Sequence, residues 1–550
     1  MLTFVGIHDT IRKNVRAMGR GRGKNMKKAI AFLLMMLYLI SSGCGTSSPG
    51  GDKPGNSEGG EASDSLESCP VSGTVHCDNA NDGYCDLCGD YVVVLLDFYT
   101  LNDLHGKFAD GDTHPGVDEL TTYLKNAREK DDVAFFLSAG DMWQGSAESN
   151  NTQGFIITDW MNALDFDAMT LGNHEYDWGE AAIEGNAEIA EFPFLAINVY
   201  DRESNTRVDY CEASLLVDRG GIQVGIVGAM GDCYSSIATD KTQDIYFITG
   251  SQLTTLVKEE AARLRSQGAD FIVYVIHDGY GDSKTAGVTD VSGNQLSSYY
   301  DVALSDGSVD LVFEGHTHQR YVLKDRYGVY HMQSGGENKG LAHVEIALNV
   351  ANGQRVVNTA EFVSNTVYRD MADDPVVKEL MNKYAAQIED AMRVVGRTSR
   401  YRSSTELRNL VAKLYYQVGQ ETWGDAYDIV LGGGFISVRN PYELPAGEVT
   451  YATLQSIFPF DNDLVLCSIK GRDLISRFIQ TSNNNYYIYM GGKSESEVVK
   501  SIDPNGTYYI ITDTYCSGYA PNKLTVVEKY TPGIYARDLL ADYIAAGGME

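Results

Sequence analysis

Five short polar motifs between residues 102 and 318 contain side chains that suit metal ions. Their groups are carboxylates, imidazoles and an amide, with no cysteine among them, a set that favours zinc, manganese, iron or cobalt over copper(I). Two such ions about 3.5–4 Å apart hold a bridging hydroxide and clamp a phosphoryl group for in-line displacement. The metal-ligand candidates are Asp103 and His105 in NDLHG, Asp141 in AGD, Asn173 in GNHEYD, His277, and His316 and His318 in GHTH.

Each motif follows an apolar run that is typical of a strand buried on both faces. The expected strands cover residues 92–100, 133–137, 168–171, 271–276 and 309–313, with another at 222–230 and helices at 117–130 and 253–267. In open α/β sheets ligands gather outside the carboxyl ends of the strands, so we expect the motifs to meet at one edge. A lone histidine there is usually structural, but five such motifs in order favour a metal centre.

The length indicates more than one domain. The chain has 550 residues, whereas single hydrophobic cores stop growing near about 250–300 residues. We expect an α/β layered domain at residues 91–368, a linker helix at 369–398 and a second α+β domain at 399–550. The formal charge is 44 − 75 = −31, which opposes binding to nucleic acid and to bare anionic membranes. An anionic substrate must therefore meet local positive charge.

The N-terminal segment predicts export. Basic residues lead into twelve apolar residues, Ala29–Ile40, a length that suits a signal-peptide core rather than a membrane span. Gly43-Cys44 follows and resembles the lipobox of bacterial lipoproteins, which implies cleavage before Cys44 and a lipid anchor as the only membrane contact. We therefore expect a signal peptide at 1–44, a flexible tether at 45–68 and a cell-surface or secreted location.

A short cysteine-rich module at 69–90 follows the tether. Four thiols with a terminal CxxC form a candidate structural metal site, and two disulfides are the alternative in an exported chain. Two further pairs, Cys211/Cys233 and Cys467/Cys516, either form disulfides or serve as small buried hydrophobic residues. The module's cysteines are Cys69, Cys77, Cys85 and Cys88.

The five motifs together resemble the set of the calcineurin-like metallophosphoesterase superfamily. With the second region, their order resembles the secreted 5'-nucleotidase/UDP-sugar hydrolase family. That resemblance implies a four-layer α/β/β/α metallophosphatase domain joined by a helix to a C-terminal substrate-binding domain. By the same resemblance Asp103, His105, Asp141 and His318 hold one divalent metal, and Asp141 bridges to a second held by Asn173, His277 and His316. His174 then stabilises the transferring phosphoryl group, and Asp177 orients its ring.

The C-terminal region departs from the family pattern. The family's glycine-rich turn ends in an arginine that meets substrate, and here Leu431-Gly-Gly-Gly-Phe runs on to a displaced Arg439. Phe460, Asn462 and Tyr515 fit substrate-binding positions, with the two rings stacking on a base. The expected function is extracytoplasmic hydrolysis of nucleoside 5'-monophosphates. The alternatives are a nucleotide sugar, cyclic nucleotide or other phosphodiester as substrate, or an inert surface binding protein.

Overall fold

A computed structural model describes residues 76, 78, 83–86, 88, 92–110, 115–130, 134–219, 221–279, 306–325, 327–439, 443–481, 486–518 and 523–549. The predicted signal peptide and tether, with Cys44, Cys69 and Cys77, lie outside these residues. Within the described ranges, every helix is too short or too polar to span a bilayer.

The first sheet carries three of the predicted ligand motifs at strand ends. Its strand order is β14-β13-β1-β2-β3-β4, with β1 to β4 parallel and β13 and β14 antiparallel to their neighbours. The predicted strands at 92–100, 133–137 and 168–171 are confirmed as β1, β2 and β3. The bounds are β1 Val93–Leu101, β2 Phe135–Ser138, β3 Ala168–Thr170, β4 Phe194–Leu195, β13 Gly340–Asn349 and β14 Arg355–Ser364.

The second sheet carries the remaining two motifs. Its order is β11-β12-β10-β9-β7-β6, and the run β12-β10-β9-β7 is parallel. Strand β7 matches its predicted residues, and β9 and β10 lie within two residues of theirs. The bounds are β6 Ser214–Arg219, β7 Ile222–Met230, β9 Phe271–His277, β10 Leu311–Glu314, β11 Arg320–Lys324 and β12 Tyr330–Ser334.

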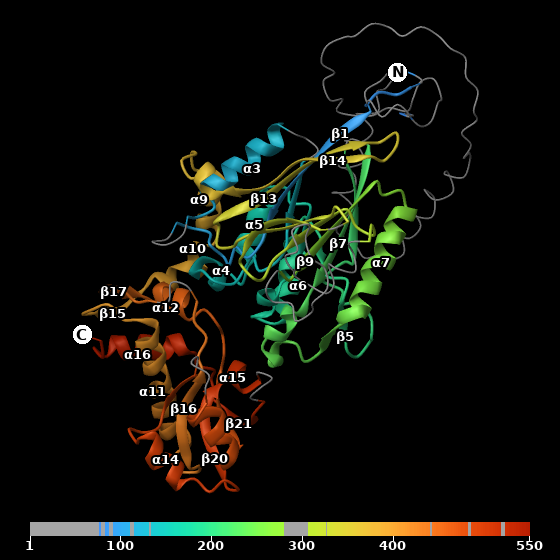
Figure 1. Cartoon of the computed structure of the whole chain (residues 1–550). Coiled ribbons are helices and arrows are strands. Elements are labelled where there is room, and N and C mark those ends of the chain that lie inside the picture. Colours follow the sequence, from blue (N-terminus) through green and yellow to red (C-terminus); the bar gives the residue numbers. More distant parts are fainter. Residues whose placement is uncertain are drawn as a thin grey trace, which may run out of the picture. The chain divides into compact units, whose positions relative to one another are not determined.

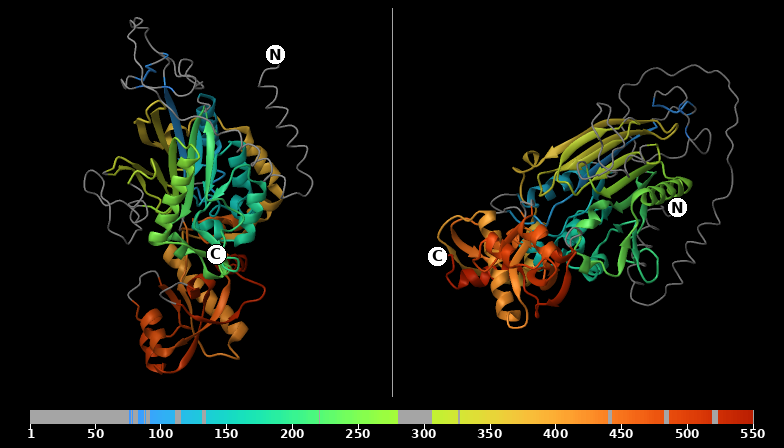
Figure 2. Two further views of the ribbon diagram at one scale, coloured as in Figure 1. Left: turned by 90° about the vertical axis from the view of Figure 1, so that its right-hand side faces the viewer. Right: turned by 60° about the horizontal axis from the view of Figure 1, so that its bottom comes forward.

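The two sheets pack face to face between two outer sets of helices, which gives the four layers expected from the sequence. One apolar cluster lies between the sheets and includes Phe98 and Leu137 of the first and Val273 and Phe313 of the second. A second cluster joins the first sheet to α3 and α5, and a third joins the second sheet to α7. Helices α3 and α7 lie on opposite sides of the sheets (Figures 1 and 2). The helix bounds are α3 Asp118–Lys130, α4 Ala147–Asn151, α5 Phe155–Ala163, α6 Glu180–Ile189 and α7 Gly250–Ser266.

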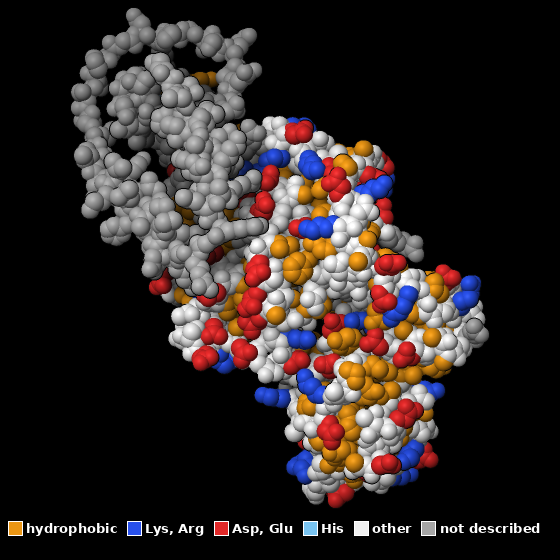
Figure 3. Space-filling view, turned by 180° about the vertical axis from the view of Figure 1, so that it is seen from behind, with side chains coloured by type: hydrophobic (Ala, Val, Ile, Leu, Met, Phe, Trp, Pro, Cys, Tyr) orange, Lys and Arg blue, Asp and Glu red, His pale blue; other side chains and the backbone are white. Residues whose placement is uncertain are grey.

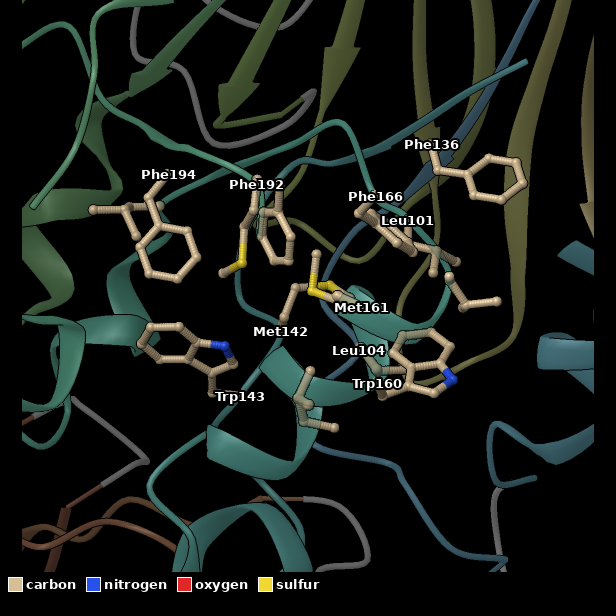
Figure 4. Packing of buried hydrophobic residues seen from close by; sticks show 14 of the residues in the cluster. Leu101, Leu104, Phe136, Met142, Trp143, Trp160, Met161, Phe166, Phe192 and Phe194 are labelled. Carbon is tan, nitrogen blue, oxygen red and sulfur yellow. The ribbon is translucent and has the colours of Figure 1, made fainter. Parts of the chain in front are cut away.

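The first-sheet helical layer holds the loop after β2 in place. Met142 and Trp143 directly follow Asp141 and are fully buried. Figure 4 shows both side chains in the same cluster as Trp160 and Phe194, and the rings of Trp143 and Phe194 meet edge to face at 5.5 Å. The backbone at Asp141 is therefore fixed by core packing on its C-terminal side.

The predicted linker helix at 369–398 is divided. Tyr384 has φ −101° and ψ 8°, which interrupts the helical path between α9 and α10. The β-branched pair Val394-Val395 then begins a strand rather than continuing a helix. The elements are α9 Pro375–Lys383, α10 Ala385–Ile388, a 3₁₀ turn Glu389–Met392 and β15 Val394–Thr398.

The C-terminal region is built on a five-stranded sheet of order β19-β16-β20-β18-β21. Helix α11 begins with a capping box, in which Ser403 and Glu406 satisfy each other's backbone N–H groups. The strands are β16 Ile429–Phe435, β18 Leu464–Lys470, β19 Tyr486–Tyr489, β20 Thr507–Asp513 and β21 Thr525–Lys529, and the main helices are α11 Ser404–Trp423, α12 Tyr451–Ile457, α14 Glu495–Ser501, α15 Thr514–Gly518 and α16 Ala536–Ala545.

The two cysteine pairs outside the module are not joined by disulfides. Cys211, Cys233, Cys467 and Cys516 are all buried, which supports the alternative that they serve as small apolar residues. On the surface, acidic and basic side chains are interspersed over the face in Figure 3. The negative net charge is therefore not gathered into one patch on that face.

Candidate metal centre

The two parallel strand sets bring the predicted ligands together. His277 ends β9, and Asp103 and Asp141 lie in the loops after β1 and β2. The Asp141 Oδ2 atom lies 3.1 Å from His277 Nε2, and Asp103 Oδ1 lies 3.2 Å from His318 Nε2. His105 Nε2 lies 2.9 Å from His318 Nε2. Separations near 3 Å are those expected for donors sharing one cation at about 2.0–2.2 Å.

These donors fall into two overlapping groups. One contains Asp103, His105 and His318, and the other contains Asp103, Asp141 and His277, each with ligand atoms within 4.8 Å of one another. Asp103 thus faces both groups. Asp141 also reaches toward both, because its Oδ2 lies 4.0 Å from His105 Nε2. Two neighbouring carboxylates therefore stand between two sets of imidazoles.

The remaining two predicted ligands, Asn173 and His316, lie beside the second group. Asn173 begins the 3₁₀ turn after β3, and its buried Oδ1 has no hydrogen-bond partner among the described residues. The ring of His316 lies 5.4 Å from that of His277. The backbone N–H of His316 donates to the Asp103 carboxylate. A buried amide oxygen with no donor is costly, and a divalent cation would satisfy it. The residues present therefore fit a metal.

Backbone contacts fix which histidine nitrogen faces the centre. His277 Nδ1 donates to Ala139 O at 2.5 Å, and His105 Nδ1 donates to Gln144 O at 3.0 Å. With Nδ1 donating to the backbone, the Nε2 atom of each ring faces the carboxylates, where it would bind a metal ion. Metal-binding histidines are typically oriented in this way.

The backbone itself is unusual at these residues. Five of the seven predicted ligands have positive φ angles, between 51° and 69°. The left-handed region is uncommon for residues other than glycine, although Asp, Asn and His tolerate it best. Clusters of such conformations mark sites where the surrounding fold enforces a geometry. The five are Asp103, His105, Asp141, His316 and His318.

The electrostatics also favour a cation. Burial lowers the pKa of His105 well below its ordinary value and keeps it neutral. Burial alone would raise the pKa of Asp141, but His277 and His174 outweigh it and hold that pKa well below the usual range. Burial lowers the pKa of His277, whereas Asp141 and Asp103 raise it to about 10. The negative field that retains this proton also attracts a metal ion.

Glu175 links two of the ligand loops, a role that sequence reasoning missed. Its carboxylate is fully buried and accepts four backbone N–H bonds, from Gly172 at 2.7 Å, Met142 at 2.8 Å, Asp141 at 2.9 Å and Trp143 at 3.3 Å. It therefore holds the Asp141 loop against the Asn173 turn. The signal was its place inside GNHEYD, directly after two site residues.

We expect Glu175→Gln to loosen this link. An amide presents a donor where the carboxylate accepts N–H groups, so about 1–3 kcal/mol of folding stability should be lost. Metal affinity should fall roughly 10–100-fold, as for other groups that orient ligands. Titration of manganese against the purified variant measures the affinity. The exposed Glu184→Gln in α6 is the matched control, and an unchanged manganese affinity in Glu175→Gln would contradict the assignment.

Cys233 is a second residue that the sequence reasoning did not place at the centre. Its sulfur lies within 4.8 Å of the ligand atoms of His277 and His316, and it contacts His277 O at 2.9 Å. The signal was available, because Gly231-Asp232-Cys233 directly follows β7, in the same parallel run as β9. The sequence reasoning placed no cysteine in the ligand set, whereas this sulfur lies within reach of two of its members.

The predicted His174 and Asp177 form a pair. His174 Nδ1 lies 2.8 Å from Asp177 Oδ2, so Nδ1 donates and Nε2 is left to accept. The backbone N–H of His174 also donates to Asp141 Oδ1 at 2.8 Å. Residue 174 therefore lies beside the carboxylates, and the Nε2 atom of its ring is directed away from Asp177.

Arg439, despite its displacement in the sequence, reaches this histidine. Its Nη2 donates to His174 Nε2 at 2.5 Å, and its guanidinium lies 5.5 Å from the Phe460 ring centroid. Burial lowers the pKa of Arg439 from its ordinary value, against the opposing effect of Asp141. A half-buried guanidinium beside His174 supplies the local positive charge that an anionic substrate requires.

A pocket of about 320 Å³ opens onto these groups. Phe460, Asn462 and Tyr515 line it together with Asn173 and His316, so all three predicted C-terminal residues reach the site. Phe460 lies 5.8 Å from the His174 ring, whereas Tyr515 packs at 5.9 Å against Phe435. The two rings are therefore not stacked on each other. Lys241 and Arg408 add two cations to the wall.

Comparison with known proteins identifies the class. Residues 99–320 match the calcineurin-like phosphoesterase family. The chain contains a calcineurin-like metallophosphoesterase domain and is a metal-dependent phosphoester hydrolase.

More specific relatives cover most of the chain. It is 25% identical over 505 residues to protein UshA of Yersinia enterocolitica, covering 80% of this chain and 89% of that protein. It is 24% identical to a snake venom 5'-nucleotidase of Crotalus adamanteus, covering 68% and 66%. The fold matches a 5'-nucleotidase precursor of Thermus thermophilus with a TM-score of 0.61 at 20% identity, covering 82% and 96%.

Proposed function

We propose that this protein hydrolyses nucleoside 5'-monophosphates at two divalent metal ions, releasing phosphate. The observation that carries the proposal is the meeting of His174, its partner Asp177 and Arg439 beside the carboxylates. His174 and Asp177 line a pocket that is also lined by aromatic rings. The 5'-nucleotidase relative supports the nucleotide as substrate. Zinc and manganese both suit the donor set.

In this proposal Asp103, His105, Asp141 and His318 would hold one ion, and Asp141, Asn173, His277 and His316 would hold the other. Asp141 is the shared carboxylate, since its Oδ2 lies 3.1 Å from His277 Nε2 and 4.0 Å from His105 Nε2. Such a pair activates water as the nucleophile and neutralises phosphoryl oxygens. The chain's own part is to fix the donors, through Glu175 and the histidine Nδ1 contacts.

Around the phosphoryl group, two side chains act directly and a third positions one of them. Arg439 binds its oxygens, because a guanidinium presents a fork of donors that matches a phosphate. His174 Nε2 faces the leaving oxygen and stabilises the charge that develops there, while Asp177 holds the ring orientation. Phe460 and Tyr515 contact the base, and Asn462 supplies a polar contact on the same wall.

We expect Arg439→Ala to raise KM for AMP roughly 10–100-fold, because a hydrogen bond to a charged group contributes about 1.5–3 kcal/mol. Arg439→Lys keeps the positive charge but lacks the paired donors of the guanidinium. Its KM for AMP should therefore lie between those of Arg439→Ala and the parent. Steady-state phosphate release measures both. Arg472→Ala, an exposed arginine of the same region, is the control. Unchanged kinetics for Arg439→Ala would remove this residue from substrate binding.

A second substrate class is favoured by one observation. Lys241 and Arg408 line the pocket, whereas Arg439 reaches it through its contact with His174. A nucleotide sugar or another phosphodiester carries further phosphate oxygens for the two lining cations to bind. A panel of AMP, a nucleotide sugar, a cyclic nucleotide and bis-p-nitrophenyl phosphate separates the classes. Release from AMP supports the nucleotidase, activity on diesters alone supports the second class, and bound metal without turnover supports an inert binding protein.

The location is part of the same proposal. Export with acylation at Cys44 rests on the apolar run at 29–40 and the Gly43-Cys44 site. Labelling of expressing bacteria with a palmitate analogue should mark the chain, and Cys44→Ala should remove the label. A labelled Cys44→Ala variant would refute lipidation at this residue.

A further inference from the structure

A second group of metal-binding side chains lies near the N-terminal end of β1. The ligand atoms of His76, Cys85 and Cys88 all lie within 4.8 Å of one another. His76 is 6% exposed and Cys85 is 2% exposed, and none of the three takes part in the catalytic centre. Residues separated by up to twelve positions therefore converge on one point.

The spacing of the donors fits a tetrahedral ion. The His76 Nδ1 and Cys88 Sγ atoms are 3.4 Å apart. In a tetrahedral zinc site with Zn–S about 2.3 Å and Zn–N about 2.0–2.1 Å, a nitrogen and a sulfur ligand lie about 3.5 Å apart. One imidazole with two thiols is a borderline-to-soft set that selects zinc over magnesium, calcium or manganese.

The described residues of the surrounding module form a small apolar core. It consists of Cys85 and Val92, with Cys88, Val350 and Ala351 packed against them. Segments this small are usually fixed by a metal or a disulfide, since their burial of apolar surface is too limited. A metal ion bound by His76, Cys85 and Cys88 would supply that restraint.

The same module is attached to the phosphatase sheet at the turn between β13 and β14. Asp78 Oδ2 accepts from Asn349 Nδ2 at 2.7 Å and from Gly83 N at 2.8 Å. Asn352 Nδ2 donates to Asp78 O at 3.1 Å, and Val92 N donates to Gly83 O at 2.9 Å. Ordering the module would therefore also order the entry into β1, the strand that leads to Asp103.

We propose that His76, Cys85 and Cys88 bind a structural zinc ion that fixes the start of β1 against the β13–β14 turn. The thiols lose their protons to solvent when the ion binds, so loading releases protons. Cys85 and Cys88 belong to the four cysteines expected from the sequence, and His76 is an additional donor. Cys69 and Cys77 lie outside the described residues. The site is independent of the nucleotidase assignment.

The test is zinc stoichiometry of the full chain, measured by mass spectrometry after purification with zinc and removal of loosely held metal. We expect Cys88→Ser and His76→Ala each to lose one zinc per chain relative to the parent. The exposed Asp86→Asn, in the same module, is the matched control and should lose none. Hydrolysis of bis-p-nitrophenyl phosphate with excess manganese should stay within about twofold in all three variants, which separates this site from the catalytic one.

Cobalt substitution gives a second readout that does not depend on yield or stability. Thiolate ligation produces a charge-transfer absorption in the near ultraviolet, and Cys88→Ser should weaken it while Asp86→Asn should not. Equal zinc content in parent, Cys88→Ser and His76→Ala would overturn the proposal. So would a zinc-free purified chain in which Cys85 or Cys88 is locked in a disulfide.

Discussion

Replacing Asp141 by Asn is expected to lower kcat for AMP on the order of a thousandfold. The substitution keeps the shape but removes the charge that faces His277 at 3.1 Å and His105 at 4.0 Å. Loss of about 4 kcal/mol of transition-state stabilisation corresponds to this factor, and losses of single electrostatic contacts reach about 10²–10³-fold. Phosphate release and metal content, measured together, check the prediction.

The Asp141→Asn substitution should also change the pKa of His277. Asp141 raises the pKa of His277, so removing the charge should lower that pKa and weaken the attraction for a cation at the same nitrogen. Metal content should therefore fall with activity. The control is Asp232→Asn, at an exposed aspartate in the turn after β7. This variant should keep the parental activity and metal content. An Asp141→Asn enzyme with more than a tenth of parental turnover would rule out a central role for this carboxylate.

Replacing His174 by Ala is expected to lower kcat about 10²–10⁴-fold, the range for removal of a positioned acid or base, with a much smaller change in KM. The reason is that Asp177 holds Nδ1, while Nε2 faces Arg439 and the side on which the phosphoryl group would bind. An interaction formed mainly in the transition state affects turnover more than binding. Steady-state kinetics on AMP separate the two parameters.

Two further variants test the role of His174, one with an intermediate effect and one as a control. Asp177→Asn keeps the ring but weakens its orientation, so a loss of roughly 10–100-fold is expected. His343→Ala removes a histidine that also pairs with an aspartate, His343 Nε2 lying 2.7 Å from Asp97 Oδ1. It lies on β13 opposite Tyr99 of β1 and outside both groups of donors, so the substitution should leave kcat unchanged. Equal losses in kcat and in affinity for His174→Ala would exclude the assigned role.

The parallel strands and the ligand motifs were predictable because each signal is local. An apolar run followed at once by Asp-x-His or His-x-His needs only a few residues to be recognised, and β1, β7 and β9 lie where the runs predicted. The antiparallel strands β13 and β14 carry polar residues on one face. Without a continuous apolar run they gave no comparable signal.

The contacts within the site depended on tertiary structure. Arg439 and His174 are 265 positions apart, and nothing in the spacing after the glycine turn shows that the guanidinium reaches the histidine. Cys233 was missed because the predicted ligand set contained no cysteine, although its turn follows a parallel strand. The single linker helix was wrong in detail because Tyr384 adopts a conformation outside the helical region, which neighbouring packing rather than composition selects.

The left-handed backbone at five ligand positions restricts how this centre can change by mutation. Asp, Asn and His are the non-glycine residues that enter this conformation most readily, and they are also metal ligands. A glycine at such a position would relax the chain but leave no donor, while a glutamate or cysteine would bring a donor and resist the conformation. Few single substitutions satisfy both demands, so the route from this centre to a different ligand set requires the loop and the ligand to change together.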